Sequence, residues 1–157
     1  MTIAPEGVRG FDFLHGRWNV ASRKLVQRLC GSDDWDEFPG TADCRSLFNG
    51  AANVDEIEFP TRGFSGLTVR LFDPERQEWS IYWADSRDGL LQPSVVGRFA
   101  DGRGDFYGDD TEDGRPIRVH FIWSEITSES ARWEQSFSLD GEGWETNWIM
   151  EFELADR

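Results

Sequence analysis

The sequence predicts an all-β protein: a single antiparallel up-and-down β-barrel of about ten strands with a short N-terminal helical turn. Short segments alternate apolar and polar residues, as half-buried strands do. Turns rich in Gly, Asp, Asn and Pro separate these segments at hairpin spacing, so consecutive strands are expected to be neighbours. No helical pattern of useful length is present to cover the apolar side of the sheet, and closure into a barrel covers it instead. A flattened sandwich is the alternative.

The alternation is clearest in three C-terminal segments, residues 117–123, 131–139 and 145–152. Successive side chains of a strand point to opposite faces, so each segment has an apolar and a polar face. The apolar face comprises Ile117, Val119, Phe121, Trp123, Trp133, Phe137, Leu139, Trp148, Met150 and Phe152, with Gln135 and Thr146 as polar members. The polar face comprises Arg118, His120, Arg132, Glu134, Ser138, Glu145, Asn147 and Glu151.

The rest of the chain is interpreted in the same way. The elements expected in order are a loose tail (residues 1–9), one helical turn (11–14), a strand from Trp18 to Leu29, an acidic loop (31–37) and strands over residues 41–48, 52–59, 66–72, 79–84, 94–99 and 105–108. The chain is thus expected to form one domain, residues 1–157, with the barrel over residues 11–154.

Composition and charge exclude two classes of partner. The 157 residues include 16 Lys and Arg against 30 Asp and Glu, a formal net charge of −14 at pH 7. This charge repels phosphate backbones and anionic lipids, so neither nucleic acid nor a membrane is expected as a partner. The N-terminus lacks the basic start and apolar run of a signal peptide, and no stretch is long enough to cross a bilayer. A cytoplasmic location is expected.

Motifs for metal, cofactor or nucleophilic chemistry are missing from the sequence. Cys30 and Cys44 are too few for a disulfide framework and are interpreted as free thiols, although they could face each other across the first hairpin. Neither belongs to a CxxC motif, and the two histidines are too far apart for a familiar zinc spacing. There is no Gly-rich phosphate loop and no Gly-x-Ser-x-Gly elbow. No metal and no cofactor are therefore expected.

The N-terminal segment resembles the start of a known barrel superfamily. A short apolar turn precedes Gly16-Arg17-Trp18, which is similar to the Gly-x-Trp motif of the calycins, the superfamily of lipocalins, fatty-acid-binding proteins and nitrobindin-like proteins. The late pattern Trp-x-x-Ser-Phe-Ser-x-Asp-Gly also resembles uncharacterised bacterial members of this class. The resemblance implies that Trp18 packs across the closed end of the barrel. It also implies an arginine partner from a late strand, for which Arg132 is the candidate.

The predicted function depends on which face of the sheet points inward. With the apolar face inside, the barrel holds an aromatic pocket that suits a small hydrophobic or aromatic molecule. The candidate ligand-binding residues are then Trp79, Trp83, Phe121, Trp123, Trp133, Gln135, Trp148 and Met150. Gln135, Thr146 and Asp85 are the polar anchors of this pocket. The first hypothesis is therefore a non-enzymatic carrier or sensor.

Two alternatives stay open. If the rings fill the barrel completely, the protein has a structural role, for example as a homodimer joined through an aromatic patch. If the polar face is inside, the cavity is surrounded by Arg70, Tyr82, Arg118, His120, Arg132, Glu134 and Asn147. His120, Glu134 and Tyr82 would then be the acid and base groups of an enzyme, and arginines such as Arg118 would hold a small anionic substrate. That arrangement exposes many Trp and Phe unless a dimer covers them.

Overall fold

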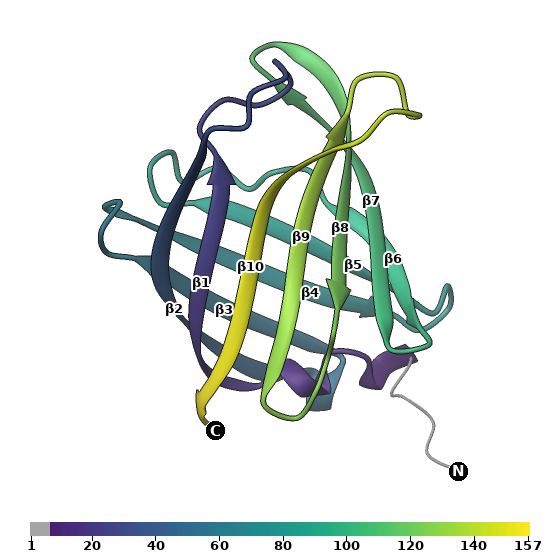
Figure 1. Ribbon diagram of the computed structural model, residues 1–157. Coiled ribbons are helices and arrows are strands. Elements are labelled where there is room, and N and C mark those ends of the chain that lie inside the picture. The colour runs from purple at the N-terminus through teal and green to yellow at the C-terminus, as the bar shows by residue number, and fades with distance from the viewer. Residues whose placement is uncertain (1–6) are drawn as a thin grey trace.

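The computed structural model describes residues 7–157 and is a closed β-barrel. Ten strands run antiparallel to their neighbours, and the last strand pairs with the first (Figure 1). The order of strands around the barrel is their order along the chain. Closure removes the free edges of the sheet and turns one of its faces inward. The predicted all-β up-and-down barrel with a short N-terminal helical turn is confirmed.

Ten strands and three short 3₁₀ turns make up the regular structure of the described residues. The elements are η1 (Gly7–Arg9), η2 (Asp12–Leu14), β1 (Gly16–Leu25), β2 (Trp35–Leu47), η3 (Phe48–Gly50), β3 (Ala52–Phe59), β4 (Phe64–Asp73), β5 (Glu78–Asp85), β6 (Val95–Ala100), β7 (Arg103–Glu112), β8 (Arg115–Ser124), β9 (Ser130–Ser138) and β10 (Glu145–Asp156). Among residues 7–157 there is no helix with the length and apolar character needed to span a membrane.

The first hairpin differs from the sequence-based expectation. β1 ends at Leu25 instead of Leu29, and Leu29 adopts a left-handed φ of 61° that does not fit a strand. β2 begins at Trp35, inside the segment that was predicted to be an acidic loop. Opposite charges favour this additional pairing, because Nε of Arg23 lies 3.5 Å from Oε1 of Glu37 across the two strands.

The apolar face of the sheet points into the barrel. The large side chains that are almost completely buried are Trp18, Trp79, Trp123, Phe11, Phe59 and Phe106. Burial of apolar surface contributes roughly 25 cal/mol per Å², which favours this arrangement over one with the rings in water. The alternative with the polar face inside is therefore wrong for Tyr82, Arg118, His120, Arg132 and Glu134, which lie on the outer face. Arg70 and Asn147 are exceptions and belong to the site described below.

Two 3₁₀ turns close one end of the barrel. η1 and η2 lie across the lower end in Figure 1, where Phe11 packs edge-on against Trp79 with ring centroids 5.0 Å apart. The indole Nε1 of Trp79 donates a hydrogen bond to the carbonyl of Gly7 at 3.0 Å. Of the segment predicted to be a loose tail, residues 7–9 thus form a turn that is tied to the barrel. Residues 1–6 lie outside the described residues.

Trp18 lies at this closed end. Its indole Nε1 donates to the carbonyl of Leu14 at 2.8 Å, and the side chain is 1% exposed. The expected partner, Arg132, is not beside it. Arg132 lies on the outer face of β9, where it contacts the carboxylates of Glu151 and Glu134. The implied pairing of Arg132 with Trp18 is wrong, because strand alternation directs Arg132 away from the barrel interior.

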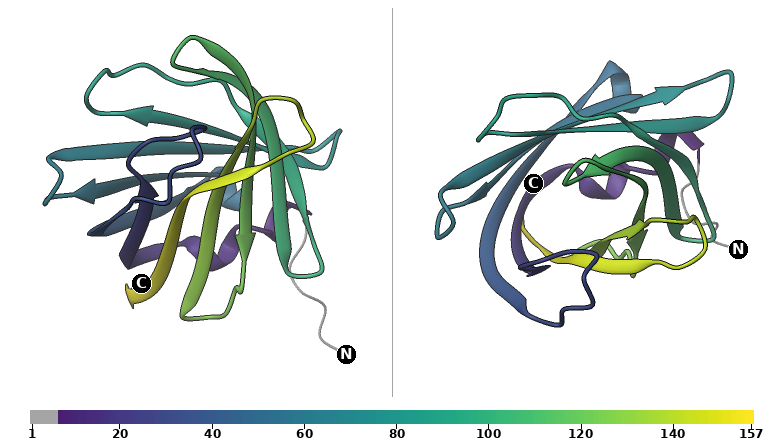
Figure 2. Two further views of the ribbon diagram at one scale, coloured as in Figure 1. Left: turned by 45° about the horizontal axis from the view of Figure 1, so that its top comes forward. Right: turned by 90° about the horizontal axis from the view of Figure 1, so that it is seen from above.

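The opposite end of the barrel is rimmed by loops, and it faces the viewer in the right-hand view of Figure 2. These loops are residues 26–34, 60–63, 86–94, 113–114 and 139–144. β5 and β6 pair only between residues 79–81 and 95–97, near the closed end. Further up, residues 86–94 follow β5, and the amide of Gln92 donates to the carbonyl of Trp83 at 2.7 Å. This segment therefore continues the barrel wall where β6 does not.

Candidate functional site

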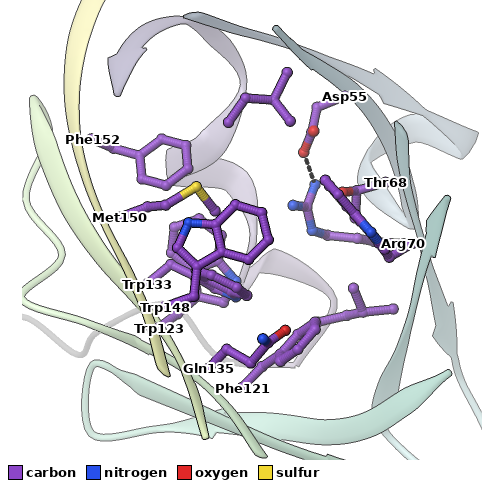
Figure 3. Close-up of a pocket in the computed structure, with 13 residues that line it drawn as sticks. Asp55, Thr68, Arg70, Phe121, Trp123, Trp133, Gln135, Trp148, Met150 and Phe152 are labelled. Atoms are coloured by element: carbon purple, nitrogen blue, oxygen red, sulfur yellow. Dashed lines mark hydrogen bonds and ion pairs between the residues drawn. The ribbon is translucent and has the colours of Figure 1, made fainter. Parts of the chain in front are cut away.

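A small chamber lies inside the barrel. Its volume is about 50 Å³, and one water-sized sphere needs roughly 10–15 Å³ on this scale, so it holds about four such spheres. The lining residues are Asp55, Ile57, Thr68, Arg70, Ile81, Trp83, Phe121, Trp123, Trp133, Gln135, Trp148, Met150 and Phe152. Figure 3 shows the rings of β8, β9 and β10 facing the polar side chains of β3 and β4. The rings fill most of the barrel but not all of it.

The chamber brings together seven of the eight predicted ligand-binding residues. These are Trp83, Phe121, Trp123, Trp133, Gln135, Trp148 and Met150. The eighth, Trp79, lies deeper, against the turns that close the barrel, and does not line the chamber. The role of these residues in ligand binding stays a prediction.

The aromatic wall is built from edge-to-face contacts. Trp148 lies nearly perpendicular to Trp133 and to Trp83, with ring centroids 5.5 Å and 6.0 Å apart. Phe121 meets Trp133 in the same manner at 5.0 Å. Edge-to-face pairs are favourable and hold each ring in a defined orientation. The wall therefore presents ring edges and faces to the chamber, a surface suited to a flat apolar molecule.

The other side of the chamber is polar, which the sequence did not predict. β3 and β4 direct Asn53, Asp55, Thr68 and Arg70 inward at paired positions. Nη1 of Arg70 donates to Oδ2 of Asp55 at 2.5 Å and to Oδ1 of Asn53 at 2.8 Å. The side chains of this ion pair are 6% and 9% exposed. The carboxylate compensates the buried guanidinium, as a charge in such surroundings requires.

The inverted pattern of β4 explains why Arg70 was assigned to the outer face. On this strand Leu67 and Leu71 point outward and remain 41% and 39% exposed, while Arg70 points inward. Alternation within one strand gives the wrong face when the apolar residues are the exposed ones. The sequence of β3 did indicate an inward-facing charged residue, because Asp55 alternates onto the same face of the strand as the apolar Ile57.

Two donors of this polar group have no hydrogen-bond partner. Nε of Arg70 and Nδ2 of Asn53 are buried and unpaired within the described residues. The rings of Phe11 and Trp123 flank the guanidinium, with centroids 5.1 Å and 5.9 Å from Cζ. A buried donor without an acceptor costs about 1–3 kcal/mol, so such donors favour an acceptor atom brought by a bound molecule.

A β-bulge in β10 adds another polar group beside the chamber. The register between β9 and β10 shifts between Thr146 and Trp148, so Asn147 is the extra residue. Asn147 is completely buried and its Oδ1 accepts a hydrogen bond from Nε2 of Gln135 at 2.9 Å. Its assignment to the outer face is therefore wrong. The same shift removes Thr146 from the chamber, and the hydroxyl of Thr146 contacts that of Ser136 instead.

A second chamber of about 60 Å³ lies next to the first. It extends toward the segment that contains Gln92 and toward Asp109 on β7. The two chambers share four lining residues, Ile81, Trp83, Phe121 and Gln135. These four side chains border both chambers and form the partition between them.

The predicted acid and base residues do not form a common site. Tyr82 lies on β5, and β6 and β7 separate that strand from β8, which carries His120. His120 stacks on Tyr107 with centroids 4.2 Å apart, and its Nε2 lies 2.8 Å from Oδ1 of Asp105. Burial opposes ionisation of Asp105, but hydrogen bonds from Arg103 and His120 outweigh it and lower the pKa of this carboxyl. His120 is thus held in a cluster outside the barrel.

Neither a metal-binding cluster nor a related protein indicates what this site does. Within residues 7–157, no three His, Cys, Asp or Glu side chains are grouped so as to hold a metal ion. The sequence matches no protein-family model and is significantly similar to no curated protein. The function is therefore inferred from the chamber itself.

Proposed function

We propose that this protein is a non-enzymatic carrier or sensor that binds a small apolar or aromatic molecule inside a calycin-like barrel. The observation that carries the proposal is the unpaired, buried Nε of Arg70 on the polar side of a chamber whose opposite wall is aromatic. The rings suit the apolar body of a ligand, and Nε suits one acceptor atom on it.

The charge of the polar group favours a neutral acceptor over a carboxylate. Asp55 already compensates the charge of Arg70 at 2.5 Å. A second carboxylate in the chamber would be repelled by Asp55 in surroundings that screen charge poorly. An ether, phenol, amide or carbonyl oxygen accepts the hydrogen bond without that repulsion.

The volume of the chamber limits the size of the ligand. A molecule larger than about four water-sized spheres requires the partition side chains to move. Trp83 and Phe121 are only partly buried, and the second chamber lies behind them. A single ring is therefore the size class that the two chambers together favour.

Ligand pairs that differ in one acceptor atom test this proposal. Tetrahydrofuran and cyclopentane form a small pair, anisole and ethylbenzene form a larger pair, and benzoate tests an anion. Isothermal titration and ligand-detected NMR are expected to show the oxygen-containing member binding about 3- to 10-fold more tightly, because one hydrogen bond contributes about 0.5–1.5 kcal/mol. Benzoate is expected to bind most weakly.

Matched variants show whether binding occurs in the chamber. Thr68→Leu fills the chamber and is expected to abolish binding, whereas Thr41→Leu makes the same change on the exposed face of β2 and is expected to leave binding intact. If wild type and Thr68→Leu bind the panel equally, or if neither binds any member, the proposal is wrong.

A second candidate function, self-assembly, is favoured by the outer face of β4. Leu67 and Leu71 are exposed there, and Val69 pairs with Val54 and Tyr82 on the neighbouring strands. An exposed apolar stripe of this kind is typical of an interaction surface. Analytical ultracentrifugation tests it: a dimer that Leu67→Glu converts to a monomer supports the assignment, and a wild-type monomer at high concentration excludes it.

A further inference from the structure

Lys24 is the only lysine in the chain, and all the other basic side chains among the 16 are arginines. It lies on β1, in the row of residues that includes Trp18 and Ser22 and faces the barrel interior. This row ends with Lys24 near the open end, where the loop that follows Leu25 begins. The one side-chain amine of the chain is thus placed at the mouth of the barrel.

An indole forms the floor beneath this amine. Nζ of Lys24 lies 4.1 Å from the ring centroid of Trp148. Trp148 also lines the inner chamber, and its Nε1 donates to Oγ of Ser22 at 3.2 Å, which holds the ring in place. Beside Lys24 is a hollow of about 320 Å³ whose wall combines the rings of Phe38 and Phe64 with the charged side chains of Arg28, Asp36, Arg62 and Arg87. A ligand that reaches the barrel from this end meets the amine beside these rings and charged groups.

No carboxylate pairs with Lys24 in the part of the chain that is described. Three acidic groups at this end are each held by an arginine: Asp85 by Arg87, Glu112 by Arg28 and Asp36 by Arg62. Burial lowers the pKa of Lys24 to about 8, with Arg28 and Arg87 adding to the effect and Asp85 and Glu112 opposing it. About a tenth of the amine is therefore neutral, and so nucleophilic, at pH 7.

We propose that Lys24 is a covalent capture site for aldehydes or ketones with an apolar or aromatic body, which it holds as a reversible imine at the barrel mouth. The proposal goes beyond ligand binding in the inner chamber, because it concerns a different atom and a bond that forms and breaks. The rings of Trp148, Phe38 and Phe64 would hold the apolar body, and the amine would select the carbonyl group.

The reaction is balanced without a further reagent. The lone pair of neutral Nζ attacks the carbonyl carbon, a C–N bond forms, and a proton passes from nitrogen to oxygen to give a carbinolamine. The C–O bond then breaks and one water molecule leaves, so that a C=N bond joins Nζ to the former carbonyl carbon. Addition of water reverses the sequence and releases the carbonyl compound. No oxidant or reductant takes part.

Reductive trapping tests the proposal directly. The protein is incubated with benzaldehyde and cyanoborohydride at pH 7.5, and intact mass and peptide mapping report the adduct. The ε-amine of Lys24 and the α-amino group of the chain are the only amines that can react, so the adduct can be located unambiguously. We expect an adduct on Lys24, which peptide mapping separates from any adduct of the α-amino group. Its rate should exceed that of Nα-acetyl-lysine methylamide about tenfold, because a neutral fraction on the order of 100-fold larger outweighs the lower basicity of the amine.

Two controls separate this proposal from its competitors. Lys24→Arg keeps the charge and the contact with Trp148 but cannot form an imine, so it is expected to melt at the same temperature and to lose this adduct. Reaction of the α-amino group alone, or of Lys24 no faster than the model amine, would overturn the proposal. So would tight binding of benzoate that Lys24→Arg retains, because that result would define an anion site. Anisole binding by Lys24→Arg reports on the inner chamber separately, so failure of one proposal does not imply failure of the other.

Discussion

Arg70 and Asp55 form an ion pair inside the barrel, with Nη1 of Arg70 2.5 Å from Oδ2 of Asp55. The two residues lie on adjacent strands, and both side chains are more than nine-tenths buried. The rings of Phe11 and Trp123 flank the guanidinium, and Asn53 accepts from the same Nη1. The protein thus holds a mutually compensated charge pair in its interior.

Removal of one member of this pair should destabilise the protein strongly. Arg70→Met leaves the carboxylate of Asp55 buried without a counter-charge, so the free energy of unfolding should fall by about 3–5 kcal/mol. The double variant Arg70→Met, Asp55→Leu should recover most of this loss, because no buried charge remains. Urea unfolding measures both values.

An exposed pair provides the control for this cycle. Arg62 and Asp36 also lie 2.5 Å apart, but on the surface, and Arg62→Met should change stability far less than Arg70→Met does, because solvent screens the exposed pair. If the double variant lost as much stability as the two single variants lose together, Arg70 and Asp55 would not be a mutually compensating pair.

The difference in the free energy of unfolding between the wild type and Lys24→Met should depend on pH between about 8 and 10.5. The pKa of Lys24 is about 8 in the folded protein and 10.5 in the unfolded chain. Between these values the unfolded state binds more protons, so the free energy of unfolding of the wild type should rise with pH relative to the variant, by up to about 3 kcal/mol. Below pH 8 the difference should be constant. Paired chemical denaturation curves from pH 7 to 10.5 measure it, and a flat difference throughout would show that Lys24 titrates normally.

The two cysteines should react at very different rates. Cys30 is exposed in the loop after β1, whereas Cys44 is buried on β2 opposite Gly16, and both are free. Burial raises the pKa of the Cys44 thiol to about 12. Ellman's reagent at pH 8 should therefore titrate one thiol in the native protein and both in denaturant. Equal rates for the two thiols in the native protein would mean that the barrel opens readily.

The close packing of the chamber wall should make Gly66→Ala costly. A Cβ atom at position 66 would lie 1.8 Å from the indole of Trp83, so this ring must move. We expect a loss of about 1–3 kcal/mol in stability, with altered near-ultraviolet circular dichroism from the displaced indole. Gly143→Ala is the matched control, because its nearest neighbouring atom is 3.9 Å away. An unchanged spectrum for Gly66→Ala would contradict the packing described for Trp83.

Most of the chamber could be predicted from the sequence because the alternation is local. On β8, β9 and β10 the apolar residues are also the inward ones, so Trp123, Trp133 and Trp148 were assigned to the correct face. The same reasoning was wrong where local structure departs from it. β4 exposes its leucines and buries Arg70, and the bulge in β10 turns Asn147 toward Gln135.

The amino-acid sequence by itself determined the number and kind of elements, because hairpin turns and period-two alternation are properties of short segments. Only the tertiary structure decided which polar groups meet. Lys24 lies over Trp148 because the first strand pairs with the last when the barrel closes. Arg70 lies beside Asp55 because the inverted face of β4 is forced inward by the strands on either side. Such contacts depend on register and closure, which join residues far apart in the chain and leave no mark in any single segment.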